Sequence, residues 1–334
     1  MNNIALQIET QTSPVGDEFS ALMAVVSPIL QGLLFGLKQE VVDQCGGLEQ
    51  MPLFMLPRAY RPGFGDCGIC FEYAAHDAIN RRVPSVIERV SDSLTRYCRV
   101  PGRETASILF GAEKTGALQI IGSPANLLTA ESRILTGAQA QPPKLKQYID
   151  KLTEAFRRSS QRSLLPSSIS GLWKADLFLG NRDTDRWVGT TVKINRSQLE
   201  GAAGLRIGIV PARYGVGDAI SLDHSKNLVI CPLPYDGDFM EIFYTGWTIV
   251  QQFLAADARV PSAVFLPIGS HIMVAKFLQD RRDYSVLDVI RAMTPMAQPE
   301  LLRTTSVPGT TAIEASTGND AVTNVIAPQP MTIF

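Results

Sequence analysis

Hydrophobic and polar residues are arranged most clearly between residues 172 and 193, where two apolar runs flank the polar segment Gly180–Arg186. A short polar segment that contains glycine, placed between two such runs, is typical of the turn of a β-hairpin. Side chains alternate between the two faces of a strand, so Thr191 and Lys193 are expected on one face of the second strand. The pattern therefore predicts a hairpin that carries an acid, Asp176, and an amine, Lys193, on neighbouring strands.

The pattern predicts further helices and strands on both sides of this hairpin. Apolar residues at helical spacing predict helices near residues 69–79, 84–98, 125–135, 144–162, 197–200, 239–256, 270–281 and 285–293. Short apolar runs bounded by glycine or proline predict strands near residues 107–110, 117–121, 205–210 and 227–233. Because helices and strands are mixed along the chain, the element order allows an α/β or an α+β class with a central mixed β-sheet. We expect the α/β class, with helices flanking the sheet.

An uncharged apolar segment, residues 19–37, precedes the predicted sheet. Its length approaches that of a membrane span, but Ser, Pro, Gln and Gly residues interrupt it and no second span follows. The favoured interpretation is a buried helix, or one that contacts a protein partner or a second copy of the chain, with no membrane. We expect an N-terminal arm and apolar helix in 1–50, an α/β domain with C-terminal helices in 51–293, and a flexible tail in 294–334. The density of proline and glycine in 51–68 predicts an irregular loop.

Composition limits the class of protein and its compartment. Acidic and basic residues nearly balance, giving a formal net charge of −1, which argues against a polybasic binder but allows a local basic groove. The five cysteines are an odd number and widely scattered, which favours free thiols in a reducing compartment. No basic start followed by an apolar core and a small-residue cleavage site is found, so the chain is predicted to be cytoplasmic.

Charged residues in mostly apolar sequence need partners or a metal ion, unless they lie on the solvated face of a two-sided hairpin. Asp176, a gap of strand-turn-strand length and then Lys193 resemble the core of the PD-(D/E)xK restriction-endonuclease-like superfamily. Glu72, in a predicted helix, resembles the helix-borne glutamate found upstream in many of its members. The family has an acid where this chain has Thr191. The resemblance covers roughly residues 65–235 and implies a restriction-endonuclease-like α/β fold.

The resemblance also implies a metal-dependent nuclease that hydrolyses DNA phosphodiester bonds with Mg²⁺ or Mn²⁺. In such an enzyme, Asp176 is the principal metal ligand, Glu72 supplies a second carboxylate, and the Val192 carbonyl supplies a third oxygen. Lys193 then lies beside the scissile phosphate. The implied setting is a prokaryotic or phage-related antiviral defence or DNA-processing system, with DNA as the partner and RNA as an alternative.

A non-catalytic interpretation stays open, because the Thr191 hydroxyl is a poorer ligand for a hard divalent cation than a carboxylate. Either Glu72 or Glu200 compensates for the missing acid, or the site has lost cleavage. In the second case the chain is an inactive nuclease-like subunit, which serves as a nucleic-acid-binding or scaffolding module in a multi-protein complex.

Two further groups of residues suggest other chemistry. Cys67-x-x-Cys70 with His76 nearby suggests zinc, but no second pair follows at metal spacing, so structural thiols are favoured. Arginines close the predicted 144–162 helix, where a solvated face is favoured over phosphate contact: Arg157, Arg158 and Arg162.

Overall fold

The structure, a computed structural model, describes residues 14–60, 66–109, 111–112, 118–119, 127–135, 144–147, 149–150, 158, 160, 175–201, 204–213, 219–235, 239–260, 266 and 269–298. These residues form an α/β protein in which a mixed seven-stranded sheet packs against helices. The class predicted from the hydrophobic pattern is confirmed at this level.

The sheet consists of β1 (Thr105–Leu109), β4 (Arg133–Leu135), β5 (Leu177–Asn181), β6 (Arg186–Val192), β7 (Arg206–Pro211), β8 (Ser221–Asp223) and β9 (Leu228–Leu233). Its order is β1-β5-β6-β7-β9-β8, and β4 pairs with β6. β5 runs antiparallel along one edge of β6, while β4 and β7 run parallel along the two halves of its other edge. Two short strands, β2 (Gly111–Ala112) and β3 (Leu118–Gln119), pair separately. β6 is therefore the strand through which the sheet is organised.

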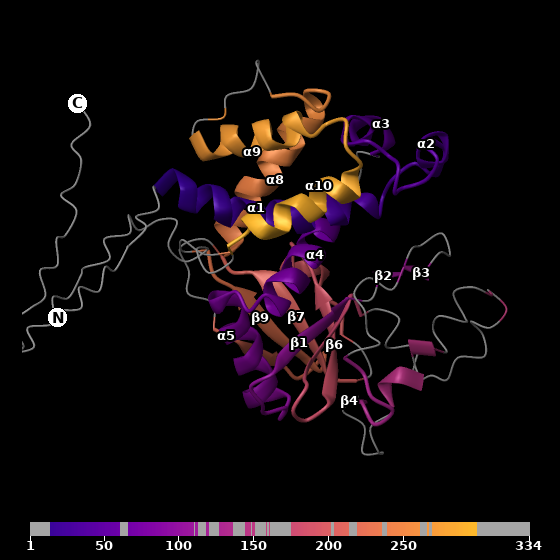
Figure 1. Ribbon diagram of the computed structural model, residues 1–334. Coiled ribbons are helices and arrows are strands. Elements are labelled where there is room, and N and C mark those ends of the chain that lie inside the picture. Colours follow the sequence, from indigo (N-terminus) through magenta and orange to yellow (C-terminus); the bar gives the residue numbers. More distant parts are fainter. Residues whose placement is uncertain are drawn as a thin grey trace, which may run out of the picture.

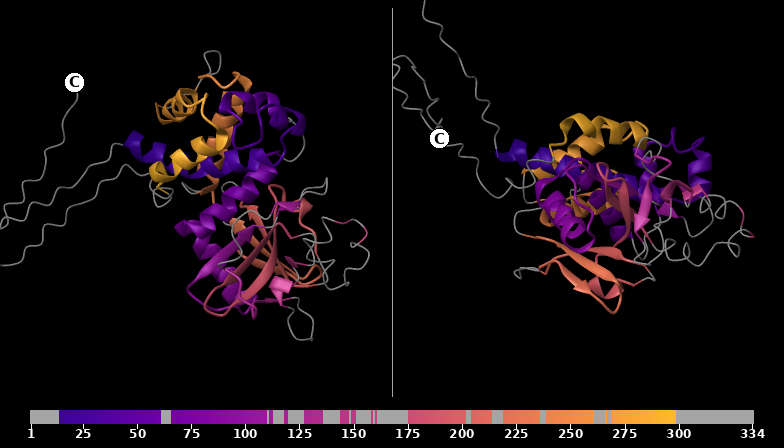
Figure 2. Two further views of the ribbon diagram at one scale, coloured as in Figure 1. Left: turned by 45° about the vertical axis from the view of Figure 1, so that its right-hand side comes forward. Right: turned by 90° about the horizontal axis from the view of Figure 1, so that it is seen from below.

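The α-helices are α1 (Pro14–Leu34), α2 (Gln39–Gln44), α3 (Leu56–Ala59), α4 (Asp66–Asn80), α5 (Pro84–Asp92), α8 (Phe239–Ala255), α9 (Gly269–Asp280) and α10 (Val286–Met293). Short helical turns are η1 (Leu53–Met55), η2 (Ser93–Tyr97), η6 (Arg196–Gln198) and η7 (Thr294–Met296). Figure 1 shows α1, α8, α9 and α10 gathered at one end and the sheet at the other, with α4 running between them and α5 beside the sheet. The views in Figure 2 show the same division into a helical end and a sheet end.

One face of the sheet shares a continuous hydrophobic core with the helices. Alternate residues of the central strands point into this core, as the period of two along a strand requires. The sheet residues in the core include Leu177, Leu179, Val188, Val192, Ile207, Ile209, Val229 and Cys231. Residues of the opposite parity, which include Thr191 and Gly208, lie on the other face.

Helix α1 contains most of the predicted apolar segment 19–37 and belongs to the same core. Among the described residues, its Asp17–Leu34 part is long and apolar enough to span a membrane, and 67% of that part is buried inside the protein. Two glycines allow close packing: a Cβ at Gly32 would lie 2.8 Å from Cys70 Cα on α4, and one at Gly246 of α8 would lie 2.9 Å from a Val25 methyl. Packing against α4 and α8 thus accounts for the apolar character of the segment.

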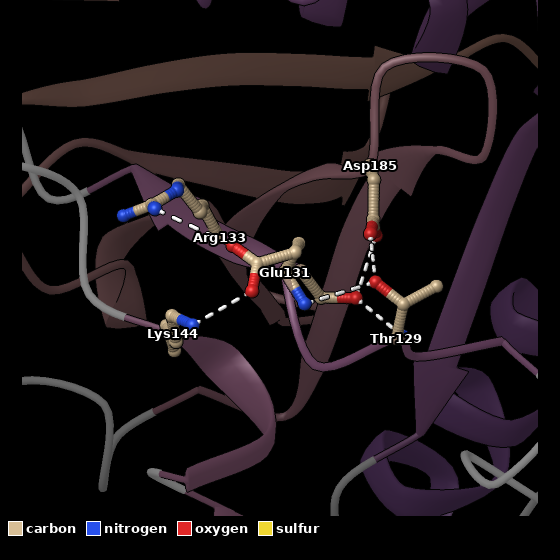
Figure 3. A network of polar contacts seen from close by, with 6 residues as sticks. Thr129, Glu131, Arg133, Lys144 and Asp185 are labelled. Atoms are coloured by element: carbon tan, nitrogen blue, oxygen red, sulfur yellow. Dashed lines mark hydrogen bonds and ion pairs between the residues drawn. The ribbon is translucent and has the colours of Figure 1, made fainter.

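The predicted hairpin is confirmed as β5 and β6, but the predicted helix at 125–135 is wrong. Residues 127–132 form turns and 133–135 form β4. Figure 3 shows that residues of this segment take part in a network of polar contacts with Asp185, which lies in the β5–β6 turn. The Asp185 carboxylate accepts hydrogen bonds from the hydroxyls of Thr129 and Ser132, both at 2.6 Å, and from Trp187 Nε1 at 3.1 Å. These tertiary bonds, with the pairing of β4 along β6, override a weak local helical pattern.

Other elements depart from the prediction in smaller ways. The loop predicted for 51–68 contains η1 and α3, where Pro57 lies in the first turn and costs no hydrogen bond. The short helix near 197–200 is the 3-10 turn η6, and β8 was not predicted. Of the predicted helix 144–162, the structure describes residues 144–147, 149–150, 158 and 160, and of these 145–147 and 149–150 are α-helical. Arg157, Arg162 and the tail beyond 298 lie outside the described residues.

Candidate active site

Asp176 lies where β5 begins and receives three hydrogen bonds on one carboxylate oxygen. Its backbone amide donates to the Thr190 carbonyl at 2.8 Å, which joins it to β6. Its Oδ2 accepts the Thr191 hydroxyl at 3.0 Å and the Val192 amide at 2.9 Å. The Lys193 ammonium donates the third bond at 2.8 Å. Asp176 thus extends the pairing with β6 by one residue before the first residue of β5. Its position is fixed by its backbone hydrogen bond to Thr190 and by the bonds that its carboxylate accepts.

Lys193 follows the last residue of β6 and joins the two acids of the cluster. Its backbone amide donates to the Ile209 carbonyl of β7 at 3.0 Å, which holds it at the end of the sheet. Its ammonium donates to Asp176 Oδ2 and, at 3.2 Å, to Glu72 Oε1. The structure therefore brings together the three side chains that the sequence singled out: Glu72, Asp176 and Lys193.

Helix α4 positions Glu72 at this end of the sheet. The neighbouring residues Phe71, Ala74 and Ala75 are buried in the core, and the helix contacts α1 on one side and β1 and β6 on the other. The amphipathic pattern of α4 fixes its rotation, because its apolar stripe must face the core. Glu72 then lies at the border of that stripe with its side chain 20% exposed, and reaches Lys193.

Burial and mutual repulsion strongly perturb the charge of Glu72. Burial, followed by the charge of Asp176, raises the pKa of Glu72 to about 8, although the Lys193 ammonium lowers it. Burial on its own lowers the pKa of Lys193, but the charges of Asp176 and Glu72 outweigh it, and the net shift is upward. Lys193 is therefore cationic at neutral pH, and Glu72 exchanges protons near neutrality.

This raised pKa predicts how stability depends on pH. A carboxyl group whose folded-state pKa lies above its unfolded value stabilises the fold below the unfolded pKa, and this contribution is lost as pH rises through the folded pKa. The window for Glu72 runs from its ordinary value of 4.5 to about 8. Wild type should lose this stability as the pH rises through the window, whereas Glu72→Gln, which cannot ionise, should not. The melting temperature of Glu72→Gln minus that of wild type should therefore increase progressively with pH between these two values. Thermal unfolding in a buffer series checks this, with the exposed Glu241→Gln as control. A temperature difference that stays constant across the window contradicts it.

Thr191 stands where the resemblance places an acid, and the structure gives it a different contact. Its side chain is buried, 4% exposed, and donates its hydroxyl proton to Asp176. Val192 contributes its backbone amide to the same carboxylate. Glu200, the other acid considered from the sequence, is exposed and is not among the groups that hydrogen-bond the Lys193 ammonium. Glu72 is thus the second acid that contacts Lys193.

His76 and the two cysteines of α4 are not part of this cluster. His76 Nδ1 lies 3.0 Å from Ser107 Oγ on β1, and Asn80 flanks the ring. Burial lowers the pKa of His76 to about 4, so the imidazole is neutral. Cys70 donates to the Ile29 carbonyl at 3.3 Å, and neither Cys70 nor Cys67 belongs to a disulfide. Within the described ranges, no group of three or more His, Cys, Asp or Glu side chains could hold a metal ion.

The two carboxylates nevertheless fit a hard divalent cation. Every hydrogen bond to Asp176 ends on Oδ2 and the one to Glu72 ends on Oε1, so each has a second oxygen that no described residue hydrogen-bonds. The charge of Asp176 adds to the effect of burial in raising the pKa of Glu72, so a nearby cation would favour the charged form of Glu72. Mg²⁺ typically uses one or two protein carboxylates and takes its other oxygens from water and phosphate. In number and type, the two carboxylates therefore match the protein ligands that Mg²⁺ typically uses.

One charged neighbour of the cluster was not predicted. Arg206 is the first residue of β7 and is 3% exposed, and its charge interacts with those of Asp176 and Glu200. The sequence contains the signal, since Arg206 is the single charged residue in the apolar run 205–210. Because arginine is rarely buried without a partner, a single arginine in a buried strand indicates that its charge has a specific role or partner.

Comparison with known proteins identifies no relative: no protein family, no curated protein and no solved structure matches the chain significantly.

Proposed function

We propose that the chain is a metal-dependent nuclease of the restriction-endonuclease-like type, which hydrolyses DNA phosphodiester bonds. The observation that carries the proposal is the contact of the Lys193 ammonium with both Asp176 and Glu72. An amine between two acids at the end of a central strand is the arrangement that the PD-(D/E)xK resemblance implies. The order of α4, the β5–β6 hairpin and parallel β7 along the sheet also agrees with it.

The side chains have distinct parts in the proposed reaction. Asp176 and Glu72 would hold Mg²⁺ or Mn²⁺, with the Val192 carbonyl as the third oxygen that the resemblance implies. The bound ion would supply Lewis acidity toward a phosphoryl oxygen and an acidified water. Lys193, released from one acid, would orient the attacking water and offset the negative charge that develops on phosphorus. The Thr191 hydroxyl and the Val192 amide keep Asp176 in one orientation throughout.

Two observations favour a second candidate, a nuclease-like subunit without catalytic activity. The Thr191 hydroxyl is neutral, so the site has one negative charge less than with the family's acid, and the Lys193 ammonium is already hydrogen-bonded to Asp176 and neutralises part of the remaining charge. Such a subunit would bind nucleic acid or act as a scaffold in a multi-protein assembly. A defence or DNA-processing system would suit either candidate.

Cleavage assays separate the two candidates. Wild-type protein should cut plasmid DNA with Mg²⁺ or Mn²⁺, and a chelator should stop the reaction. Glu72→Gln should cut more slowly and need more metal, because one carboxylate ligand is lost, whereas the exposed Glu241→Gln should behave as wild type. Parallel RNA substrates establish the preference for nucleic acid. DNA binding without cleavage of any substrate, unaffected by metal, would instead support the binding module.

A further inference from the structure

Arg206 on β7 lies on the same face of the sheet as Thr191 on β6. In the parallel pairing of β6 and β7, Gly189 is opposite Arg206 and Thr191 is opposite Gly208. Paired residues in neighbouring strands share a face, and so do residues two apart on one strand. Arg206 is therefore a diagonal neighbour of Thr191, whose hydroxyl contacts Asp176.

The guanidinium group of Arg206 has no hydrogen bond and no ion pair with any residue in the described part of the chain. Its backbone amide is satisfied by the Asn227 carbonyl at 3.0 Å, so the strand itself does not need the charge. Asp176 and Glu200 attract the guanidinium only over a distance. Burial outweighs this attraction, and the pKa of Arg206 is lowered. Arg206 as a whole residue is 3% exposed, but its guanidinium nitrogens are not among the fully covered polar atoms that lack a hydrogen-bond partner. The head group therefore keeps some contact with solvent, where an anion can reach it. Natural proteins accept a largely covered charge without an acceptor mainly where the charge has a use.

The strand beside Arg206 leaves room for an acceptor. Gly189, its partner on β6, has no side chain, and among the described residues a Cβ built there would lie within 4 Å of the Ala175 Cβ alone, at 3.6 Å. By contrast, the space at Gly208 is filled, because a Cβ there would lie 2.9 Å from a Leu199 methyl. The described residues therefore leave space at Gly189, on the β6 side of Arg206, next to the strand that carries Thr191 and leads to Lys193.

We propose that Arg206 binds a phosphate group of the nucleic-acid backbone next to the acid–amine cluster. The substrate class rests on the proposed function, whereas the anion-binding role rests on the geometry of Arg206. Guanidinium presents a planar fork of donors that matches two phosphate oxygens, which an ammonium does not. Arg206 then acts as a positioning residue that sets the phosphate chain against Lys193.

Metal-free DNA binding tests this role independently of cleavage. With a chelator present, Arg206→Met should bind a short fluorescent duplex about 10- to 100-fold more weakly than wild type, as expected for the loss of charge-assisted hydrogen bonds. Its affinity should also depend less on salt, by about one unit of the log–log slope. The exposed Arg186→Met is the matched control and should change less. Equal affinity and an equal salt slope for wild type and Arg206→Met would overturn the proposal.

Arg206→Lys covers the case in which Arg206→Met does not fold. If Arg206 only balances the charge of Asp176, the lysine variant should bind DNA as wild type does. If it binds phosphate through its fork, that variant should bind severalfold more weakly, and inorganic phosphate should raise its melting temperature less than that of wild type at constant ionic strength. If wild type binds DNA through Arg206 but cuts no substrate, the nuclease proposal fails and the phosphate role stands.

Discussion

Asp176→Ala is expected to abolish metal-dependent cleavage and to destabilise the protein. Catalysis should fall by about 1,000-fold or more, since the variant loses a metal ligand together with the group that orients Lys193. It also leaves the Val192 amide and the Thr191 hydroxyl without their acceptor. Removing one partner of a buried ion pair costs about 3–5 kcal/mol. Because the side chains of Asp176 and Lys193 are 20% and 29% exposed, we expect a smaller loss, about 2 kcal/mol.

Two measurements on the same preparation check this expectation. Plasmid cleavage with Mn²⁺ gives the catalytic loss, and denaturant unfolding without metal gives the change in the free energy of unfolding. Asp150→Ala, which removes an exposed acid, is the control for both. A variant that retains cleavage excludes Asp176 as a metal ligand. One that keeps wild-type stability would show that the three hydrogen bonds to its carboxylate contribute little.

Lys193→Met is expected to abolish cleavage while increasing the affinity for divalent metal. Without metal, the ammonium lies between the two acids, at 2.8 Å from Asp176 and 3.2 Å from Glu72. It therefore competes with a metal ion for the same negative charge. Removing a unit charge a few ångströms away at a partly solvated site changes the interaction by more than about 1.4 kcal/mol, so Mn²⁺ should bind at least about tenfold more tightly.

Calorimetric titration of Mn²⁺ into DNA-free protein measures this affinity without reference to activity. Lys226→Met, which removes an exposed lysine in the turn between β8 and β9, should leave both affinity and cleavage unchanged. Weaker or equal metal binding by Lys193→Met would mean that the two acids do not form the metal site. Tighter binding together with full cleavage would remove Lys193 from the reaction.

Local patterns predict the hairpin because strand periodicity and turn composition lie in contiguous residues. Asp176 and Lys193 could be placed on adjacent strands by counting positions across a single turn. The helices α4, α5, α8, α9 and α10 follow from helical spacing for the same reason. The pattern failed at 125–135, where side chains from that segment bind Asp185 in a turn more than fifty residues away. Local periodicity cannot predict such a contact, because it joins residues that are far apart in the sequence.

Glu72 was a candidate only through the family resemblance, because the sequence of helix α4 does not show which residues of the sheet Glu72 contacts. Its place depends on the packing of α4 between α1 and the sheet, which includes the approach of Gly32 to Cys70. Arg206 is the single charge in an apolar run, but that pattern does not show which groups lie beside it. Only the register of β6 against β7 places it beside Thr191.

The sequence by itself determined the β5–β6 hairpin with its acid and amine, the strands β1, β7 and β9, and most helices, since each depends on the side-chain order of a short segment. Tertiary structure decided which distant groups meet the hairpin. It placed Glu72 in contact with Lys193, made the Thr191 hydroxyl a hydrogen-bond donor to Asp176, and left Arg206 largely covered with no acceptor among the described residues. The physical reason is that a core is filled by whole elements, whose packing sets the distances between charges far apart in the chain.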